Sequence, residues 1–314
     1  MNPRSLLCLL GAGWLLVAPT IAFAKIERHV TRSFDVQSGG TLTIRTEGGG
    51  IKVEPSNGTV VKIDVLQRID ASSDAEADEL LKKLTLTFEQ SGSNVSSTAQ
   101  YDGDRPHSWF SHSWPPVQCE YVVTVPASYG ADLKSSGGGI TVGDLTGRVV
   151  AHTSGGGLHF GHITGDIAGQ TSGGGITIEA CNGAVDVDTS GGGITTGPIT
   201  GSAKLNTSGG GISVREVAGS VHARTSGGPI EISISGAVTN DSTFTTSGGG
   251  ITLRVDSQAR FNVDAHTSGG SVHSKLPVTV QGEIKPERLV GTVNGGGPTL
   301  TLRSSGGGIN LLPR

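Results

Sequence analysis

The sequence is short of basic residues, long apolar runs and cysteine pairs, and each shortage excludes a class of protein. Its 23 Lys and Arg residues face 27 Asp and Glu residues along the chain, whereas nucleic-acid binding needs a clustered basic surface. After the first 24 residues, no segment approaches the ~18 apolar residues of a transmembrane helix, so we expect no membrane span in the mature chain. No Cys-x-x-Cys spacing is present, which argues against a cysteine-based metal site.

Residues 1–24 have the organisation of a secretory signal peptide. Arg4 supplies a positive charge, an apolar run covers residues 6–17, and small residues flank Phe23 before Lys25. We expect cleavage near Ala24 and export to the periplasm, the cell surface or the medium. The mature chain would then carry 22 basic and 27 acidic residues, a net charge of about −5.

Glycine is abundant instead, and its spacing indicates a repeat. The 51 glycines lack the three-residue period of collagen, and many belong to a Ser-Gly-Gly-Gly-Ile or -Leu motif with a period of 18 residues. Copies begin at Ser136, Ser154, Ser172, Ser190 and Ser208, with a proline variant at Ser226. Two looser turns, each 21 residues after the last, begin at Ser247 and Ser268, and a final copy begins at Ser305.

The aligned repeats predict two short strands in each 18-residue coil. Apolar residues recur at repeat positions 5, 7, 10 and 14, while the positions between them are mixed, as in strands with one buried face. Glycine corners would allow positive φ and let coils stack about 4.8 Å apart without Cβ clashes. The predicted fold is an all-β solenoid that is stable only through stacking. Its structural positions are Gly137, Gly155, Gly173, Gly191, Gly209, Ile140, Ile176, Ile194 and Ile212.

A threonine precedes each glycine corner from Thr153 to Thr267. We interpret these threonines as a structural ladder whose hydroxyl groups bond between coils. Cys119 and Cys181 both occupy inward positions and are read as core residues. Export would permit a disulfide between them, but they belong to separate coils, which makes a bridge the less favoured alternative.

Residues 25–134 are expected to form a β-rich region before the solenoid of residues 135–314 and its closing C-terminal coils. Residues 47–51 repeat the glycine corner, which suggests one continuous sheet. A helical pattern near residues 74–84 follows Ser73, a candidate N-cap. We expect this single helix to cover the open end of the solenoid, where edge strands would otherwise pair with other chains.

A polar, aromatic-rich loop covers residues 101–116. Tryptophan side chains are favoured at interfaces, and both tryptophans of the mature chain lie in this loop. The candidate partner-contact residues are Trp109, Phe110, Trp114, His107 and His112. The two histidines, with Asp102 and Asp104, could be metal ligands, but a loop without supporting residues makes a weak site. They are read as solvated, and no metal or cofactor is expected.

The chain resembles a known family in three of its segments. Val125-Pro126 leads into residues 132–140 and the glycine corners, and the chain closes with residues 291–298 and 305–309. This combination is similar to the bacterial putative-adhesin domain family, glycine-rich β-solenoids without an assigned biochemical function. The resemblance covers nearly the whole mature chain. It implies a fold and an envelope location, and it supplies no catalytic residues.

Other functions fit the pattern less well. The glycine triplets lack the Lys and Ser or Thr that a phosphate-binding loop needs. A carbohydrate-cleaving β-helix enzyme would gather carboxylates on one outward face, but Asp186 and Asp188 have no partner acid nearby in sequence. An ice-binding surface would need a regular threonine array, which His159 interrupts. Because no other coil repeats them, His159 and His162 are read as surface variation.

The sequence therefore predicts a non-enzymatic, exported cell-envelope protein, an adhesin or a scaffold that acts through the contacts of a rigid solenoid. Its partner would be an envelope component, either a cell-surface polysaccharide or a protein. The alternative is a carbohydrate-active β-helix enzyme or a polysaccharide-binding protein.

Overall fold

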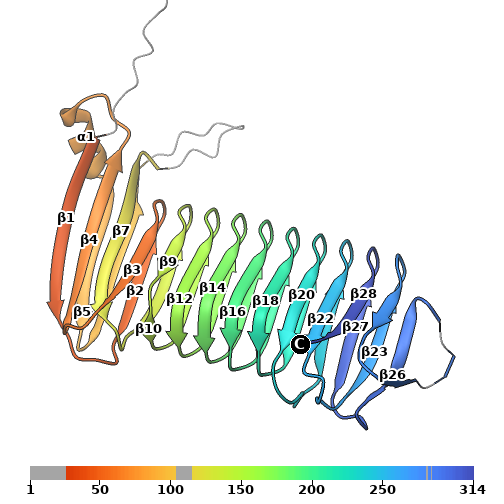
Figure 1. Cartoon of the computed structure of the whole chain (residues 1–314). Coiled ribbons are helices and arrows are strands. Elements are labelled where there is room, and N and C mark those ends of the chain that lie inside the picture. Colours follow the sequence, from red (N-terminus) through yellow and green to blue (C-terminus); the bar gives the residue numbers. More distant parts are fainter. Residues whose placement is uncertain (1–25, 104–114, 281, 284) are drawn as a thin grey trace, which may run out of the picture.

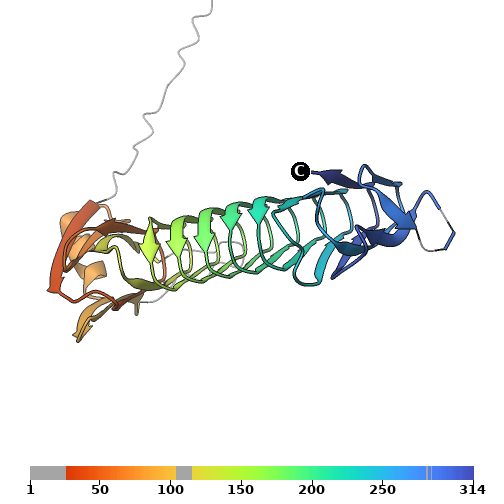
Figure 2. The same cartoon turned by 60° about the horizontal axis from the view of Figure 1, so that its bottom comes forward.

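Two long sheets face each other and form a flattened rod (Figure 1). The structure is a computed structural model that describes residues 26–103, 115–280, 282–283 and 285–314. Each sheet contains 14 strands. Figure 2 shows the coils one behind another along the rod, each contributing a strand to both sheets. The predicted all-β solenoid is confirmed.

The first sheet, sheet A, begins at the end of the rod that carries the N-terminal strands. In spatial order, its strands are β1 (Ile26–Asp35), β4 (Val60–Ile69), β7 (Val117–Pro126), β3 (Ile51–Ser56), β9 (Ile140–Val142), β12 (Leu158–Thr164), β14 (Ile176–Asn182), β16 (Ile194–Ile199), β18 (Ile212–Val217), β20 (Ile230–Ile234), β22 (Ile251–Val255), β28 (Ile309–Pro313) and β24 (Val272–Ser274), with β10 (Leu145–Thr146) beside β12.

Sheet B is described from the opposite end of the rod, and it too follows the stack of coils. Its strands are β25 (Val278–Val280), β26 (Arg288–Val293), β23 (Phe261–Thr267), β27 (Thr299–Ser304), β21 (Ser242–Thr246), β19 (Val221–Thr225), β17 (Ala203–Thr207), β15 (Val185–Thr189), β13 (Ile167–Thr171), β11 (Val149–Thr153), β8 (Gly130–Ser135), β2 (Thr41–Thr46), β6 (Asn94–Tyr101) and β5 (Leu84–Ser91).

The 18-residue period places equivalent residues side by side. Ile176 on β14 pairs with Leu158 on β12 and with Ile194 on β16, in parallel register. These side chains belong to a single core that runs along the rod between the sheets. Ile140, Ile176, Ile194 and Ile212 are each 1% exposed. Each coil therefore buries its apolar face on its neighbours, as expected of a solenoid.

The glycine corners are required by close packing between coils. A Cβ atom on Gly155, Gly173, Gly191 or Gly209 would lie 2.5 Å from the carbonyl oxygen of the equivalent glycine in the preceding coil. The expected positive φ is absent from the corner triplets of these 18-residue coils. It occurs instead at the opposite corner, at Gly147 and Gly165. Contact between neighbouring backbones, and not a left-handed bend, thus selects glycine in the triplets.

The threonine ladder bonds between coils, and its acceptors are glycine carbonyl groups. Thr171 Oγ1 donates to the Gly156 oxygen at 2.6 Å, and Thr189 Oγ1 donates to the Gly174 oxygen at the same distance. The same bond joins each pair from Thr153 with Gly138 to Thr225 with Gly210. Each bond ties a buried side chain to the corner of the coil before it.

The last coil lies inside the stack, although the sequence order placed it at the closing end. β27 pairs with β21 on one side and β23 on the other, while β28 lies between β22 and β24. The C-terminus therefore lies part-way along the rod (Figure 1). Beyond the inserted coil, β25 and β26 end sheet B with antiparallel pairing. Because the final coil carries the same corner motif as the others, its sequence did not reveal this order.

At the other end of the rod, both sheets are continuous across residue 134, where the β-rich region was expected to meet the solenoid. β2 pairs with β8, and β3 pairs with β9. Helix α1 (Asp74–Leu81) begins after the N-cap Ser73 and buries Ala77. Eight helical residues span about 12 Å, so the helix covers one corner of this end (Figure 1). The sheet edges here are β1 and β5.

Candidate functional site

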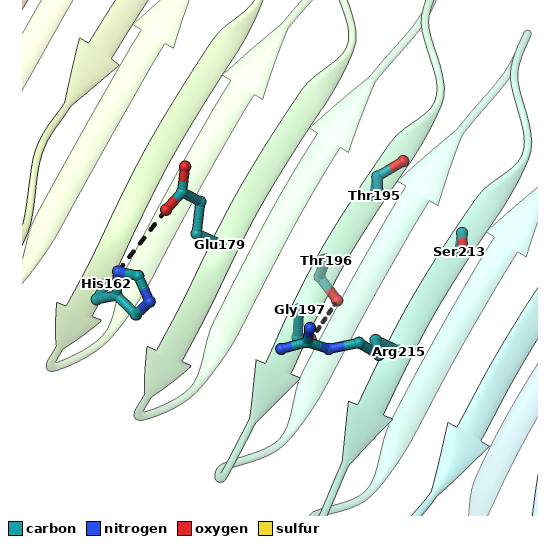
Figure 3. A pocket seen from close by; sticks show the side chains of 7 residues that line it. All are labelled: His162, Glu179, Thr195, Thr196, Gly197, Ser213 and Arg215. Carbon is teal, nitrogen blue, oxygen red and sulfur yellow. Dashed lines mark hydrogen bonds and ion pairs between the residues drawn. The ribbon is translucent and has the colours of Figure 1, made fainter.

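A shallow hollow of about 460 Å³ crosses the outer face of sheet A over β12, β14, β16 and β18. Apart from Gly197, its lining residues all have side chains with a polar group (Figure 3). The residues are His162, Glu179, Thr195, Thr196, Gly197, Ser213 and Arg215. The hollow therefore offers hydrogen-bond donors, acceptors and both signs of charge on one face.

The hollow exists because repeat position 8 changes from coil to coil. This position holds Glu179, then Gly197, then Arg215, on three successive coils. A Cβ atom on Gly197 would lie 1.8 Å from the backbone oxygen of Glu179, so the close approach of β14 leaves room only for glycine. Because Gly197 has no side chain, the Arg215 guanidinium reaches over it, and its Nη2 lies 3.7 Å from the place where a Cβ atom of Gly197 would stand (Figure 3). We call Glu179, Gly197 and Arg215 the position-8 notch.

Arg215 is exposed, and its side chain lines the hollow. In the described part of the chain, no carboxylate forms an ion pair with it. The neighbouring Glu216 carboxylate instead accepts a hydrogen bond from Arg314 at 2.6 Å. The pKa of Glu216 is lowered, first by a hydrogen bond with Ser235, then by Arg314, and also by the charge of Arg215.

His162 and Glu179 form the other rim of the hollow, and they interact with His159 and Asp144, which do not line it. Glu179 lies 3.4 Å from His159 Nε2 and 3.7 Å from His162 Nδ1. Asp144 Oδ1 accepts a hydrogen bond from the backbone N–H of His162 at 2.7 Å and lies 3.2 Å from its Nδ1. The backbone bond is the main cause of the lowered pKa of Asp144. This rim holds the Glu179 carboxylate between two imidazole rings.

The rim has the residue types of acid–base chemistry but not the burial. The four side chains are between 43% and 64% exposed, so water weakens their mutual interactions. Within the residues that the structure describes, no group of three His, Cys, Asp or Glu side chains is arranged to hold a metal ion. The arrangement is suited to hydrogen bonding a polar ligand.

Sequence reasoning missed this group because it treated His159 and His162 as isolated variation. Residues 18 apart lie on neighbouring coils, so Asp144 and His162 share one repeat position. Comparing charged residues and histidines at positions 6, 8 and 9 of successive repeats would have found the group.

The other candidate residues have different outcomes. Trp109, Phe110, Trp114, His107 and His112 lie outside the described residues. Cys119 and Cys181 are both buried and free, so the alternative of a disulfide between them is wrong. Asp186 is paired with Lys204 at 3.1 Å, on sheet B and away from the hollow. None of the helices in the described ranges is long and apolar enough to cross a membrane.

Comparison with known proteins identifies a family. No curated protein matches the chain. A putative lipid binding protein from Parabacteroides distasonis ATCC 8503 has a similar structure, with 12% identity, a TM-score of 0.42, and coverage of 90% of this chain and 96% of that one. A putative adhesin from Bacteroides fragilis NCTC 9343 has 12% identity, a TM-score of 0.38, and coverage of 91% and 97%. A putative cell adhesion protein from Clostridium sporogenes ATCC 15579 has 10% identity, a TM-score of 0.25, and coverage of 93% and 100%.

At these identities and scores, the structural likenesses do not identify a function. The sequence profile of the Toastrack DUF4097 family matches residues 39–312. The chain therefore belongs to the Toastrack DUF4097 family.

Proposed function

We propose that this protein is exported to the cell envelope and acts there by contact, as an adhesin or a scaffold, without catalysing a reaction. The observation that carries the proposal is the in-register outer face of sheet A, on which polar side chains repeat once per coil. From β9 to β18, the outward column consists of Thr141, His159, Thr177, Thr195 and Ser213.

A rigid face of this kind suits binding by many weak contacts. Its side chains stand on paired strands, so less conformational entropy is lost when a partner binds. Repeated contacts on one partner raise the overall affinity through effective concentration. A long envelope polymer could use several coils together.

The direct test is binding of the purified chain from residue 25 to the envelope of the source bacterium. We expect saturable binding to the envelope fraction that a soluble protein of similar net charge does not show. Protease treatment of intact cells would then locate the protein, because a surface protein releases fragments and a periplasmic one is protected. Absence of saturable binding would refute the contact function.

A carbohydrate-active enzyme is the second candidate, favoured by the carboxylates of Asp144 and Glu179 beside His162. Incubation of the protein with a panel of polysaccharides measures polysaccharide cleavage directly. We expect no release of reducing ends or unsaturated products. Turnover that disappears in Glu179→Gln would overturn the contact proposal.

A further inference from the structure

We propose that the position-8 notch binds an acidic sugar unit of a polysaccharide. The sugar carboxylate would bind Arg215, and its hydroxyl groups would bind Glu179 and the hydroxyls of Thr195 and Ser213. This inference rests on the proposed contact function and names the ligand class of its site.

The guanidinium of Arg215 selects for a carboxylate. Its planar array of N–H donors matches the two oxygens of a carboxylate, and such paired hydrogen bonds are stronger than neutral ones. The nearest acid in sequence, Glu216, is already bonded to Arg314. A ligand carboxylate therefore meets a cation that no ion pair of the described residues occupies.

The remaining groups match the hydroxyls of a sugar. Glu179 offers acceptor oxygens, and its carboxylate is held near His159 and His162. Thr195 and Ser213 are exposed, and each hydroxyl can both donate and accept. The hollow of about 460 Å³ lies within the range of small-ligand sites, roughly 300–1,000 Å³.

A peptide ligand fits the notch less well. Peptides commonly add to an open sheet edge or insert apolar side chains into a groove. Here β16 is paired on both sides, with β14 and β18, so it offers no edge. The lining supplies charge and hydroxyl groups, with no large apolar side chain among its residues.

The notch also opens onto a longer surface. Thr177, Thr195 and Ser213 stand in register on β14, β16 and β18, the strands of the notch, and the same outward column continues with His159 on β12 and Glu231 on β20. A polymer can contact several of these while one acidic unit occupies the notch. We therefore expect a polymer to bind more tightly than its monomer.

The test is calorimetric titration of the chain from residue 25 with polygalacturonate, galacturonic acid, neutral dextran and poly-glutamate. We expect polygalacturonate to bind at least tenfold more tightly than dextran or poly-glutamate.

Arg215→Gln should weaken polygalacturonate binding by about tenfold to a hundredfold, the effect of losing a charge-assisted hydrogen-bond pair. Arg215→Lys should recover part of it, because lysine keeps the charge but not the paired geometry. Thr195→Glu should also weaken it, because a second carboxylate in the notch repels the ligand.

Arg224→Gln is the matched control. Arg224 is an exposed arginine on β19 of sheet B, away from the notch, and its loss should leave the Kd unchanged. If Arg224→Gln and Arg215→Gln lower the affinity for polygalacturonate equally, the proposed site is wrong. It is also wrong if polygalacturonate does not bind. Equal binding of dextran would overturn the role of the carboxylate, and equal binding of poly-glutamate would overturn the sugar. If Arg215→Gln leaves the Kd for polygalacturonate unchanged, the notch inference fails. The contact function still stands in that case, provided that the protein binds the envelope fraction.

Discussion

The buried threonines are a residue-scale device for joining coils. Thr189 is 5% exposed, and its hydroxyl donates to the Gly174 carbonyl of the preceding coil. We expect Thr189→Val, which keeps the shape but removes the donor, to lower the free energy of unfolding by about 1–3 kcal/mol. Urea denaturation measures the change. Thr177→Val is the control, because Thr177 is exposed, and equal midpoints for the two variants would contradict a role for the bond.

The two buried thiols should be inert at the pH of most labelling experiments. Burial raises the pKa of Cys119 to about 12. Burial and then the charge of Asp166 raise the pKa of Cys181 to about 11. Only the thiolate reacts, and raised pKa values keep both thiols protonated at pH 8.

We therefore expect iodoacetamide at pH 8 to label the folded protein far more slowly than the protein in urea. Mass spectrometry of both samples, with free cysteine as a rate reference, measures the difference. Rapid labelling of both cysteines in the folded protein would mean that they are not core residues.

At the scale of elements, the inserted coil holds the far end of the rod together. β28 buries Ile309 and Leu311, and it pairs with β22 on one side and β24 on the other. Truncation after residue 298 removes β27 and β28, which leaves the strands beyond them without their parallel neighbours.

We expect this truncation to expose the chain after β22 to proteases, while the earlier coils stay protected. Mass spectrometry of the protected fragment gives the boundary. Arg314→Gln is the control, since it removes only an ion pair with Glu216 and should leave the digestion pattern unchanged. Protection of residues 261–293 in the truncated chain would show that the inserted coil is not required there.

For the whole molecule, the stacked architecture predicts a gradient of stability along the rod. A middle coil has a neighbour on both sides, whereas an end strand has one. Hydrogen exchange followed by mass spectrometry should therefore show the slowest exchange in β14 to β17 and faster exchange in β1, β5 and β25. Uniform protection along the chain would indicate one cooperative unit instead of a repeat array.

The amino-acid sequence alone was sufficient for the coil, its corners and its inward residues. Every coil must bury apolar residues at the same repeat positions, so a column such as Ile176 and Ile194 can be recognised from spacing and hydrophobicity. The helix after Ser73 was also readable, because its cap and pattern are local. Less could be predicted of the site: Arg215, Glu179 and the two histidines carry no motif, and the sequence favoured the loop at residues 101–116.

Three-dimensional packing was needed for the order of the coils and for the position-8 notch. Ile309 pairs with Ile251, 58 positions earlier, although the repeat would place it beyond Val272. Similar corners fit together in several orders, so the pairing depends on the free energy of the complete stack. The notch likewise arises from three coils at once, because Glu179, Gly197 and Arg215 line one hollow only when β14, β16 and β18 stack in this order.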